Sequence, residues 1–411
     1  MSAATSITSR LVRILGPDPR AVGQSAAALL ISIVATLIAG LTLATAEDRL
    51  AELPGLLLMV PAAIAQRGNV FGALGSRLGT AIHTGEFSLT RRIDTIFGQN
   101  VLASLALSAV AAIWLAIAGW ALAGVFGVVG AMSLVDFVAV SFVGGMLASV
   151  LVLAITVALA AGSTRYRWDL DNVTAPLVTG TGDLVTLPAL IVGSFLVGPS
   201  NASEIVGVVA VLVAIAVLGL GIRSSLPLLR RIVLESLPVL ALASTLSLIA
   251  GIVVERRLAA FLDEPALLIL IPAYFGMAGA LGGILSSRLG TKVHLGLIEP
   301  QRLPQRQALL DIRSVGLLAI PIFVLVGGAA HVGALTIGVA SPGLTTMLSV
   351  AALAGIGATL VVLAVAYYGT LLAVRLGLDP DTATIPLTNS VLDLVGAFTL
   401  VGAVIALGLG G

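Results

Sequence analysis

The sequence contains no cysteine, and this absence excludes several chemistries at once. A chain without thiols forms no disulfide, holds no iron–sulfur cluster or zinc–thiolate site, and has no cysteine nucleophile. Histidine is nearly absent as well. Three residues scattered over 411 positions argue against a histidine-based zinc cluster.

Charge is also scarce. Only 10% of the residues are Asp, Glu, Lys or Arg, whereas a soluble domain carries about 25%. Apolar residues make up 58% of the chain, and the mean hydropathy is +1.14. Because so few charges cannot cover a surface that faces water, the composition predicts an all-α polytopic protein of the cell membrane, surrounded by the lipid bilayer. The net charge of +1 argues against a nucleic-acid partner.

Apolar runs of about 20 residues mark candidate transmembrane helices. The sequence has eleven of them, and several exceed the minimum length for one crossing. They lie near residues 25–46, 53–80, 94–119, 131–162, 172–198, 204–222, 232–254, 265–290, 312–332, 342–375 and 382–410.

The basic residues predict the orientation of these spans. If the N-terminus lies in the cytosol, 15 of the 21 Lys and Arg residues fall in cytosolic segments, three in outer loops and three within spans. Cytosolic loops of membrane proteins are enriched in Lys and Arg. The distribution therefore favours an N-in, C-out chain with an odd number of spans.

The chain also repeats itself. The motif Ser-Arg-Leu-Gly-Thr at 76–80 recurs at 287–291, an offset of 211, and the segment 169–176 recurs at 379–386, an offset of 210. Two motifs at nearly one spacing predict a duplication. Each copy holds five spans, and the extra run at 204–222 keeps the two copies parallel.

We therefore expect four segments in the chain. They are a short cytosolic segment at 1–24, a first five-helix repeat at 25–200, a linker transmembrane helix at 201–224, and a second five-helix repeat at 225–411. One chain would then be a pseudo-dimer. The axis between its halves is the natural place for a pore or a site.

Two acids inside apolar runs are the sharpest functional signal. Asp183 and Asp393 each stand seven residues after the proline of the second repeated motif. A charged residue at a helix centre costs about 2.5–3.5 kcal/mol on insertion scales, so such residues usually serve a function. Carboxylates, hydroxyls and carbonyls are hard oxygen ligands that favour Mg²⁺, Ca²⁺, Mn²⁺ or an alkali ion. The alternative is that Arg77 and Arg288 pair with the two acids across helices.

Four further acids stand just before the last span of each copy. They are Asp169, Asp171, Asp379 and Asp381. Four carboxylates from two copies can together form a cation site on the cytosolic side. Capping of the helix N-terminus, where Asp is preferred, is the competing interpretation.

Glycine is abundant, with 46 residues, and some of it follows helical spacing. Gly72, Gly75 and Gly79 form one stripe. A second stripe holds Gly276, Gly279 and Gly283. Stripes of small residues are typical of closely packed transmembrane helices, and we expect close contacts along both.

The pattern Asp-x-Asp-Asn-x-x-x-Pro, followed by a threonine and an acid, resembles the last helix of MgtE-type magnesium transporters. The segment 61–80 resembles their second helix, and two fused copies with a linking helix are similar to solute carrier family 41. The resemblance implies transport of a divalent cation between two halves: Mg²⁺ first, with Mn²⁺, Co²⁺ and Ca²⁺ as further candidates. It implies that Asp183 and Asp393 bind the ion. It also implies that backbone carbonyls of Thr179 and Asn389, one turn earlier, help to hold hydrated magnesium.

Two other functions remain open. A Na⁺- or H⁺-coupled divalent cation exchanger would use the same acids. An intramembrane Mg²⁺-dependent transferase would use the Asp-x-Asp motifs at 169–171 and 379–381. The chain lacks clustered basic residues for a diphosphate and has two symmetric copies, so we expect a transporter and not an enzyme.

Overall fold

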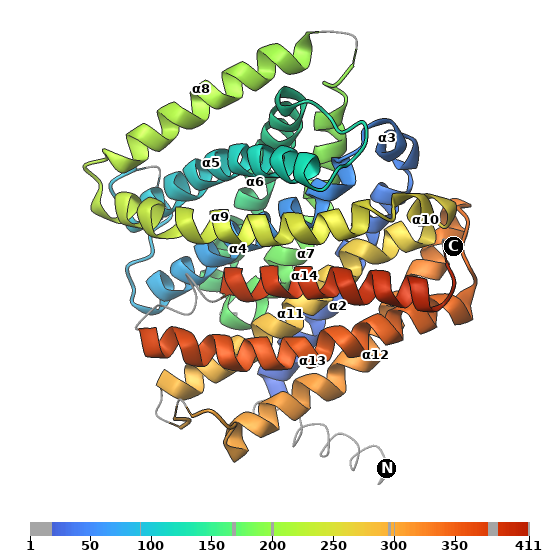
Figure 1. The fold of residues 1–411 in the computed structure, drawn as a ribbon. Coiled ribbons are helices and arrows are strands. Elements are labelled where there is room, and N and C mark those ends of the chain that lie inside the picture. Colours follow the sequence, from blue (N-terminus) through green and yellow to red (C-terminus); the bar gives the residue numbers. More distant parts are fainter. Residues whose placement is uncertain are drawn as a thin grey trace.

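The computed structural model describes residues 19–90, 92–166, 170–198, 201–294, 297–299, 301–376 and 385–409. Within these ranges the chain is a bundle of helices without any strand (Figure 1). The helices are α2 (Pro19–Ala44), α3 (Glu47–Glu52), α4 (Leu56–His83), α5 (Ile96–Val125), α6 (Leu134–Tyr166), α7 (Leu170–Ser194), α8 (Ala202–Ile222), α9 (Pro227–Glu255), α10 (Leu258–Asp263), α11 (Ala266–His294), α12 (Arg306–Ile337), α13 (Leu344–Leu376) and α14 (Ile385–Ala406).

Among the described residues, ten helices are long and apolar enough to cross a membrane. Helix α2 has 26 residues, and its described apolar part, Leu29–Ala44, is shorter than the other ten. These helices confirm the prediction of an all-α, multi-pass membrane protein.

The order of the helices repeats along the chain. A long helix, a short helix and four long helices occur twice, with α8 between the two series. The short helices α3 and α10 begin 211 residues apart (258 − 47 = 211) and end 211 residues apart (263 − 52 = 211). We call α2–α7 the first half and α9–α14 the second half.

Local signals fix where several helices begin and end. The hydroxyl of Thr95 accepts a hydrogen bond from the backbone N–H of Gly98 at 3.1 Å and so caps α5. Helix α9 begins with Pro227, which lacks the N–H that would be unpaired there. Helix α12 ends at Gly338, whose φ of 75° is left-handed and unfavourable for other residues.

The first helix of each half packs against the opposite half. Helix α2 contacts α7 of its own half and α11 of the other, and α9 contacts α14 of its own half and α4 and α5 of the other. Figure 1 shows α9 between α5 and α14. The two halves therefore exchange their first helices across the interface.

Backbones meet at the two crossings that this exchange creates. A Cβ atom on Gly40 would clash with the carbonyl oxygen of Ile269, and one on Gly251 would clash with that of Leu58. The two contacts are related by the repeat spacing (251 − 40 = 211; 269 − 58 = 211). Only glycine permits such an approach, because any side chain would occupy the space of the neighbouring backbone.

The predicted glycine stripes are confirmed in part. A Cβ on Gly276 would lie 3.0 Å from neighbouring side-chain atoms, as expected for close packing. At Gly72 and Gly283 no atom lies within 4 Å of the Cβ position, so the expectation of close contacts along the full stripes is wrong. The spacing marks a small-residue face, but α4 and α11 turn that face toward open space at these two positions.

Helix α8 lies at the edge of the bundle beside α5 and α6 (Figure 1). Only 22% of its apolar window is buried. Its exposed residues include Ile205, Val208 and Leu212. An apolar helix that is this exposed belongs in lipid.

Candidate cation site between the two halves

The structure places Asp183 and Asp393 at equivalent buried positions on the last helix of each half. Asp183 lies on α7 and is completely buried, and Asp393 lies at the equivalent place on α14 with 7% of its surface exposed. Helix α7 touches α11, and α14 touches α4. The two acids therefore lie at the interface between the halves.

The surroundings of the two acids differ. The hydroxyl of Ser247, on α9, donates a hydrogen bond to Oδ2 of Asp393 at 2.6 Å. Neither oxygen of Asp183 has a hydrogen-bond partner within the described part of the chain. Asp183 fits there because α11 carries a glycine beside it: the Cβ position of Gly276 is 3.0 Å from Oδ2 of Asp183.

Thr179 and Asn389 lie toward the beginning of α7 and α14, where they face glycines. The hydroxyl of Thr179 is 3.6 Å from the Cβ position of Gly68, and the side-chain oxygen of Asn389 is 3.9 Å from that of Gly279. These contacts are again repeat-related (279 − 68 = 211; 389 − 179 = 210). The two predicted residues thus occupy equivalent positions between the second long helix and the last helix of each half.

Several polar atoms on this side of the acids are buried and unpaired among the described residues. They are Oδ1 of Asn69, Oδ1 of Asn389 and the hydroxyl of Ser390. Buried polar atoms in proteins are nearly always hydrogen-bonded. Oxygen atoms left without a partner here can face a cation or the water molecules that it carries.

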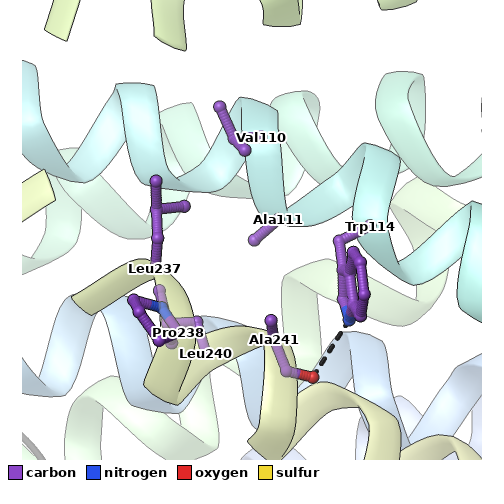
Figure 2. Close-up of a pocket in the computed structure, with 7 residues that line it drawn as sticks. All are labelled: Val110, Ala111, Trp114, Leu237, Pro238, Leu240 and Ala241. Atoms are coloured by element: carbon purple, nitrogen blue, oxygen red, sulfur yellow. Dashed lines mark hydrogen bonds between the residues drawn. The ribbon is translucent and has the colours of Figure 1, made fainter. Parts of the chain in front are cut away.

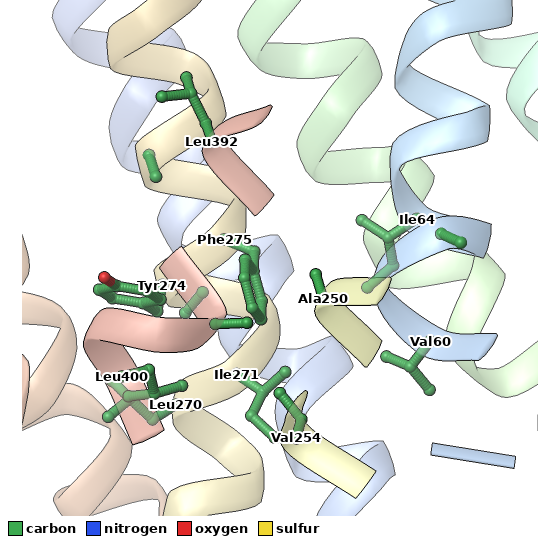
Figure 3. Close-up of a cluster of buried hydrophobic side chains, with 14 of the residues drawn as sticks. Val60, Ile64, Ala250, Val254, Leu270, Ile271, Tyr274, Phe275, Leu392 and Leu400 are labelled. Atoms are coloured by element: carbon green, nitrogen blue, oxygen red, sulfur yellow. The ribbon is translucent and has the colours of Figure 1, made fainter. Parts of the chain in front are cut away.

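Buried apolar side chains of α4, α9, α11 and α14 form a cluster between the halves (Figure 3). Val60 and Ile64 of α4 and Ile271 and Phe275 of α11 are at most 5% exposed there. The pairs are related by the repeat (271 − 60 = 211; 275 − 64 = 211). Phe275 directly precedes Gly276, whose Cβ position is 3.0 Å from Oδ2 of Asp183, so these apolar side chains adjoin that acid.

Arg67 of α4 is a completely buried cation in the first half. Its guanidinium donates to the hydroxyl of Ser149 on α6 and, at 2.5 Å, to the side-chain oxygen of Gln66. Its Cβ is 3.5 Å from the Cβ position of Gly182, next to Asp183. Arg67 is one of the three basic residues that the sequence predicted to lie within spans, and no partner was predicted for it.

Arginine pairing does not account for the two acids. Within the described ranges, neither acid forms an ion pair. Instead, Nε of Arg77 donates to the side-chain oxygen of Asn100 on α5 at 2.6 Å. The interpretation in which Arg77 and Arg288 neutralise the acids is therefore wrong for the described structure.

The structure does not describe the side chains of the four acids that were predicted to form a cytosolic-side site. Asp169, Asp379 and Asp381 lie outside the described residues, and the side chain of Asp171 is likewise not described. The cytosolic-side cation site and the capping interpretation therefore stay predictions.

Sequence reasoning missed two side-chain contacts of α9, one within the second half and one between the halves. One is the hydrogen bond from Ser247 to Asp393. The other involves Glu255, at the end of α9, whose carboxylate accepts from the backbone N–H groups of Gly55 at 2.8 Å and Leu58 at 2.9 Å. A carboxylate at a helix N-terminus satisfies unpaired N–H groups and the helix dipole. The only sequence signal for this contact was the position of Glu255, an acid at the end of an apolar run.

A separate crevice of about 270 Å³ lies between α5 and α9 (Figure 2). The indole N–H of Trp114 on its wall donates to the carbonyl of Ala241 at 3.0 Å. Its lining is otherwise apolar, so it does not suit a hydrated cation. The lining residues are Val110, Ala111, Trp114, Leu237, Pro238, Leu240 and Ala241.

Outside the spans, two acids have shifted proton affinities. Partial burial, together with the neighbouring charge of Asp263, raises the pKa of Glu264, between α10 and α11. A hydrogen bond from the Arg92 side chain lowers the pKa of Asp94, before α5. Neither lies on α7 or α14, which carry the acid pair.

Comparisons with known proteins agree with these features. A family model described as MgtE, divalent cation transporter, matches residues 60–193 and 271–403. The two matches begin 211 residues apart (271 − 60 = 211), which is the spacing of the internal repeat.

Curated relatives belong to solute carrier family 41. Member 2 from Xenopus laevis is 27% identical over 289 residues, covering 66% of this chain and 49% of that protein. Member 2 from Homo sapiens is 28% identical over 263 residues, covering 60% and 44%. The chain thus spans about half the length of the curated relatives it matches.

Among solved structures, the crystal structure of the eukaryotic MATE transporter AtDTX14 covers 97% of this chain and 95% of its own. Its sequence identity is 15% and its TM-score is 0.27, too low for a shared fold to be argued. The family model, by contrast, covers well over half of the 411 residues in two repeat-related segments. The chain belongs to the MgtE family of divalent cation transporters.

Proposed function

We propose that the protein transports Mg²⁺ across the membrane along a pathway between its two halves, and that Asp183 and Asp393 hold the ion. The observation that carries this proposal is the burial of two carboxyl groups at equivalent places on α7 and α14, one of them without any hydrogen-bond partner among the described residues. A buried carboxylate without a partner is unfavourable in a membrane, and a bound cation relieves that penalty. Membership of the family supports a divalent cation as the substrate.

The ligand set favours magnesium. Mg²⁺ keeps several water molecules and needs only one or two carboxylates from the protein. The two acids supply these carboxylates, and the unpaired oxygens of Asn69, Asn389 and Ser390 are available to the water molecules of the ion. Backbone carbonyls of Thr179 and Asn389 belong to the same proposal. Mn²⁺, Co²⁺ and Ca²⁺ use oxygen ligands too and remain alternative substrates.

Transport is favoured over transferase chemistry. The relatives are solute carriers, and the family is one of transporters. An exchanger driven by Na⁺ or H⁺ would use the same two acids, so coupling is a question for experiment.

The test is magnesium flux into proteoliposomes that contain a magnesium-sensitive dye, with and without a Na⁺ or pH gradient. Asp183→Asn and Asp393→Asn each remove one charged ligand, a loss of about 1.5–3 kcal/mol, so we expect flux at limiting Mg²⁺ to fall about tenfold or more. Asp136→Asn is the matched control. Asp136 is an acid of the first half that accepts a hydrogen bond from the hydroxyl of Ser133 at the start of α6. The Mg²⁺ flux of the Asp136→Asn variant should equal that of the parent protein.

Each outcome has a definite meaning. Equal flux in all variants would contradict the acid-pair site. An absence of Mg²⁺ flux in the parent under every gradient would contradict magnesium transport. A dependence of flux on the Na⁺ or pH gradient would identify an exchanger.

A further inference from the structure

The first helix of each half places one hydroxyl-bearing side chain near one of the two acids. We infer that these hydroxyls, on Ser247 and Thr36, make Asp183 and Asp393 unequal cation ligands, and that Ser247 sets the preference of the site for Mg²⁺ over Ca²⁺. The inference rests on the proposed function. It adds positioning residues and a source of selectivity to that function.

Ser247 is held in an unusual arrangement for a serine in a membrane helix. Such hydroxyls commonly bond back to the carbonyl three or four residues earlier. Thr370 does so here, donating to the carbonyl of Ala366 at 2.8 Å. The hydroxyl of Ser247, which is completely buried, donates instead to Oδ2 of Asp393. One oxygen of this carboxylate is therefore fixed before any ion arrives.

Thr36 occupies the equivalent position in the first half (247 − 36 = 211) and is also completely buried. Its methyl group and Oδ2 of Asp183 both lie 3.0 Å from the Cβ position of Gly276, so they border the same space. Its hydroxyl, however, donates to the carbonyl of Ile33 at 3.0 Å. Both carboxylate oxygens of Asp183 therefore remain available to a cation, whereas in Asp393 the hydroxyl of Ser247 already occupies one oxygen.

The exchanged helices hold these hydroxyls in place. Ser247, Gly251 and Glu255 follow each other at intervals of four residues and so lie on one face of α9. Gly251 touches the backbone of Leu58, and Glu255 caps α4, which fixes that face against the other half. Thr36 and Gly40 have the same spacing on α2. The position of each hydroxyl is therefore set by packing between the halves.

This difference has a chemical consequence for the bound ion. Ca²⁺ takes six to eight oxygen ligands and accepts bidentate carboxylates, whereas Mg²⁺ requires a compact octahedron. A hydroxyl that occupies one oxygen of Asp393 disfavours bidentate binding by that carboxylate. Ser247 therefore favours Mg²⁺, and its removal should admit Ca²⁺.

The experiment measures the KM for Mg²⁺ and the inhibition of Mg²⁺ flux by Ca²⁺ in proteoliposomes. In Ser247→Ala we expect the KM for Mg²⁺ to rise about tenfold, since a hydrogen bond to a charged group is lost, and Ca²⁺ to inhibit at lower concentration. Ser247→Thr keeps the hydroxyl and should restore both values. Thr36→Val should change the KM by less than about twofold, because the hydroxyl that it removes serves its own helix.

Thr370→Val controls for the loss of a buried hydroxyl elsewhere in the membrane, and both its KM and its Ca²⁺ inhibition should match the parent. If Ser247→Ala does not fold, Ser247→Cys, with its weak S–H donor, should give intermediate values. Parent-like KM and Ca²⁺ inhibition in the folded Ser247 variant would overturn the inference. So would an effect of Thr36→Val as large as that of Ser247→Ala. Either result leaves the proposed function intact, which fails only if the parent lacks flux or tolerates loss of the acids.

Discussion

In the first half, the buried guanidinium of Arg67 ties α4 to Ser149 of α6, whereas in the second half the hydroxyl of Tyr274 ties α11 to α13 and α14. The position equivalent to each anchor in the other half is an alanine. Ala278 corresponds to Arg67 (67 + 211 = 278), and Ala63 corresponds to Tyr274 (274 − 211 = 63). Both alanines are buried. The two halves thus share a backbone plan but hold their own helices together with different chemistry.

The backbone crossings between the halves, and the positions of the two acids, show the opposite behaviour. Gly40 and Gly251 make the same backbone approach, and Asp183 and Asp393 occupy equivalent places at the interface. A physical reason is available. At a crossing where two backbones touch, only one residue type fits, whereas inside a half any side chain that fills the space and satisfies its polar atoms is adequate. Symmetry should therefore be strict where the backbones of the two halves touch and loose where side chains fill the space.

The largest expected effect comes from the anchor of the first half. Arg67→Ala removes a fully buried side chain and leaves a cavity among α4, α6 and α7, so we expect the free energy of unfolding to fall by about 3 kcal/mol. The midpoint of thermal unfolding in detergent measures this loss. Arg67→Met, which fills the space without a charge, should lose about 1 kcal/mol or less, because a buried charge without a carboxylate partner contributes little net stability.

Ala278→Gly, at the equivalent position of the second half, is the matched control and should lower the stability only slightly. A loss in Arg67→Met as large as that in Arg67→Ala would show that the charge itself is required. In that case the first half would differ from the second in electrostatics and not only in packing.

The next effect tests the symmetric part of the comparison. Gly40→Ala and Gly251→Ala each place a methyl group against a backbone carbonyl of the other half, so both should destabilise the protein by about 2 kcal/mol. Gly72→Ala and Gly283→Ala, also a repeat-related pair, meet open space and should change the thermal midpoint little. Unequal losses for Gly40→Ala and Gly251→Ala would break the symmetry that the interface shows.

These glycines also illustrate what the sequence could and could not predict. The apolar runs located the long helices: the run at 204–222 became α8, Ala202–Ile222, and the offset of 211 reappears in the bounds of α3 and α10. Hydropathy works here because lipid demands long, internally hydrogen-bonded apolar helices. The same reasoning singled out Asp183 and Asp393, since a charge inside such a run is conspicuous.

Contacts between helices were beyond that reasoning. The stripe through Gly72 indicated close packing, but the tight crossings use Gly40 and Gly251, because periodicity shows which face is small and not which helix lies against it. Ser247 was equally hidden. Ser244 and Thr245 stand within three residues of it, and only the packing of α9 against α14 determines which hydroxyl reaches a carboxylate.

The smallest expected effect concerns the anchor of the second half. Tyr274→Phe removes a hydroxyl that lies 3.0 Å from the carbonyl of Ala354 and 2.7 Å from the hydroxyl of Thr399. Thr399 keeps its hydrogen bond to the carbonyl of Val395 at 3.0 Å, so only one acceptor loses its partner. We expect the free energy of unfolding to fall by about 1 kcal/mol, because that is the typical contribution of one neutral hydrogen bond. A lower midpoint of thermal unfolding in detergent would report this loss.

This substitution also separates anchoring from ion binding. Tyr274 bonds only within its own half, whereas Ser247 bonds to one of the two acids, so Tyr274→Phe should lower stability and leave the KM for Mg²⁺ unchanged. Tyr367→Phe, which removes a hydroxyl that donates to the carbonyl of Gln301, is a control for hydroxyl loss elsewhere in the same half. A raised KM in Tyr274→Phe without any change in stability would contradict the division of labour. It would mean that the anchor of a half tunes the ion site as directly as a side chain that bonds to one of the acids.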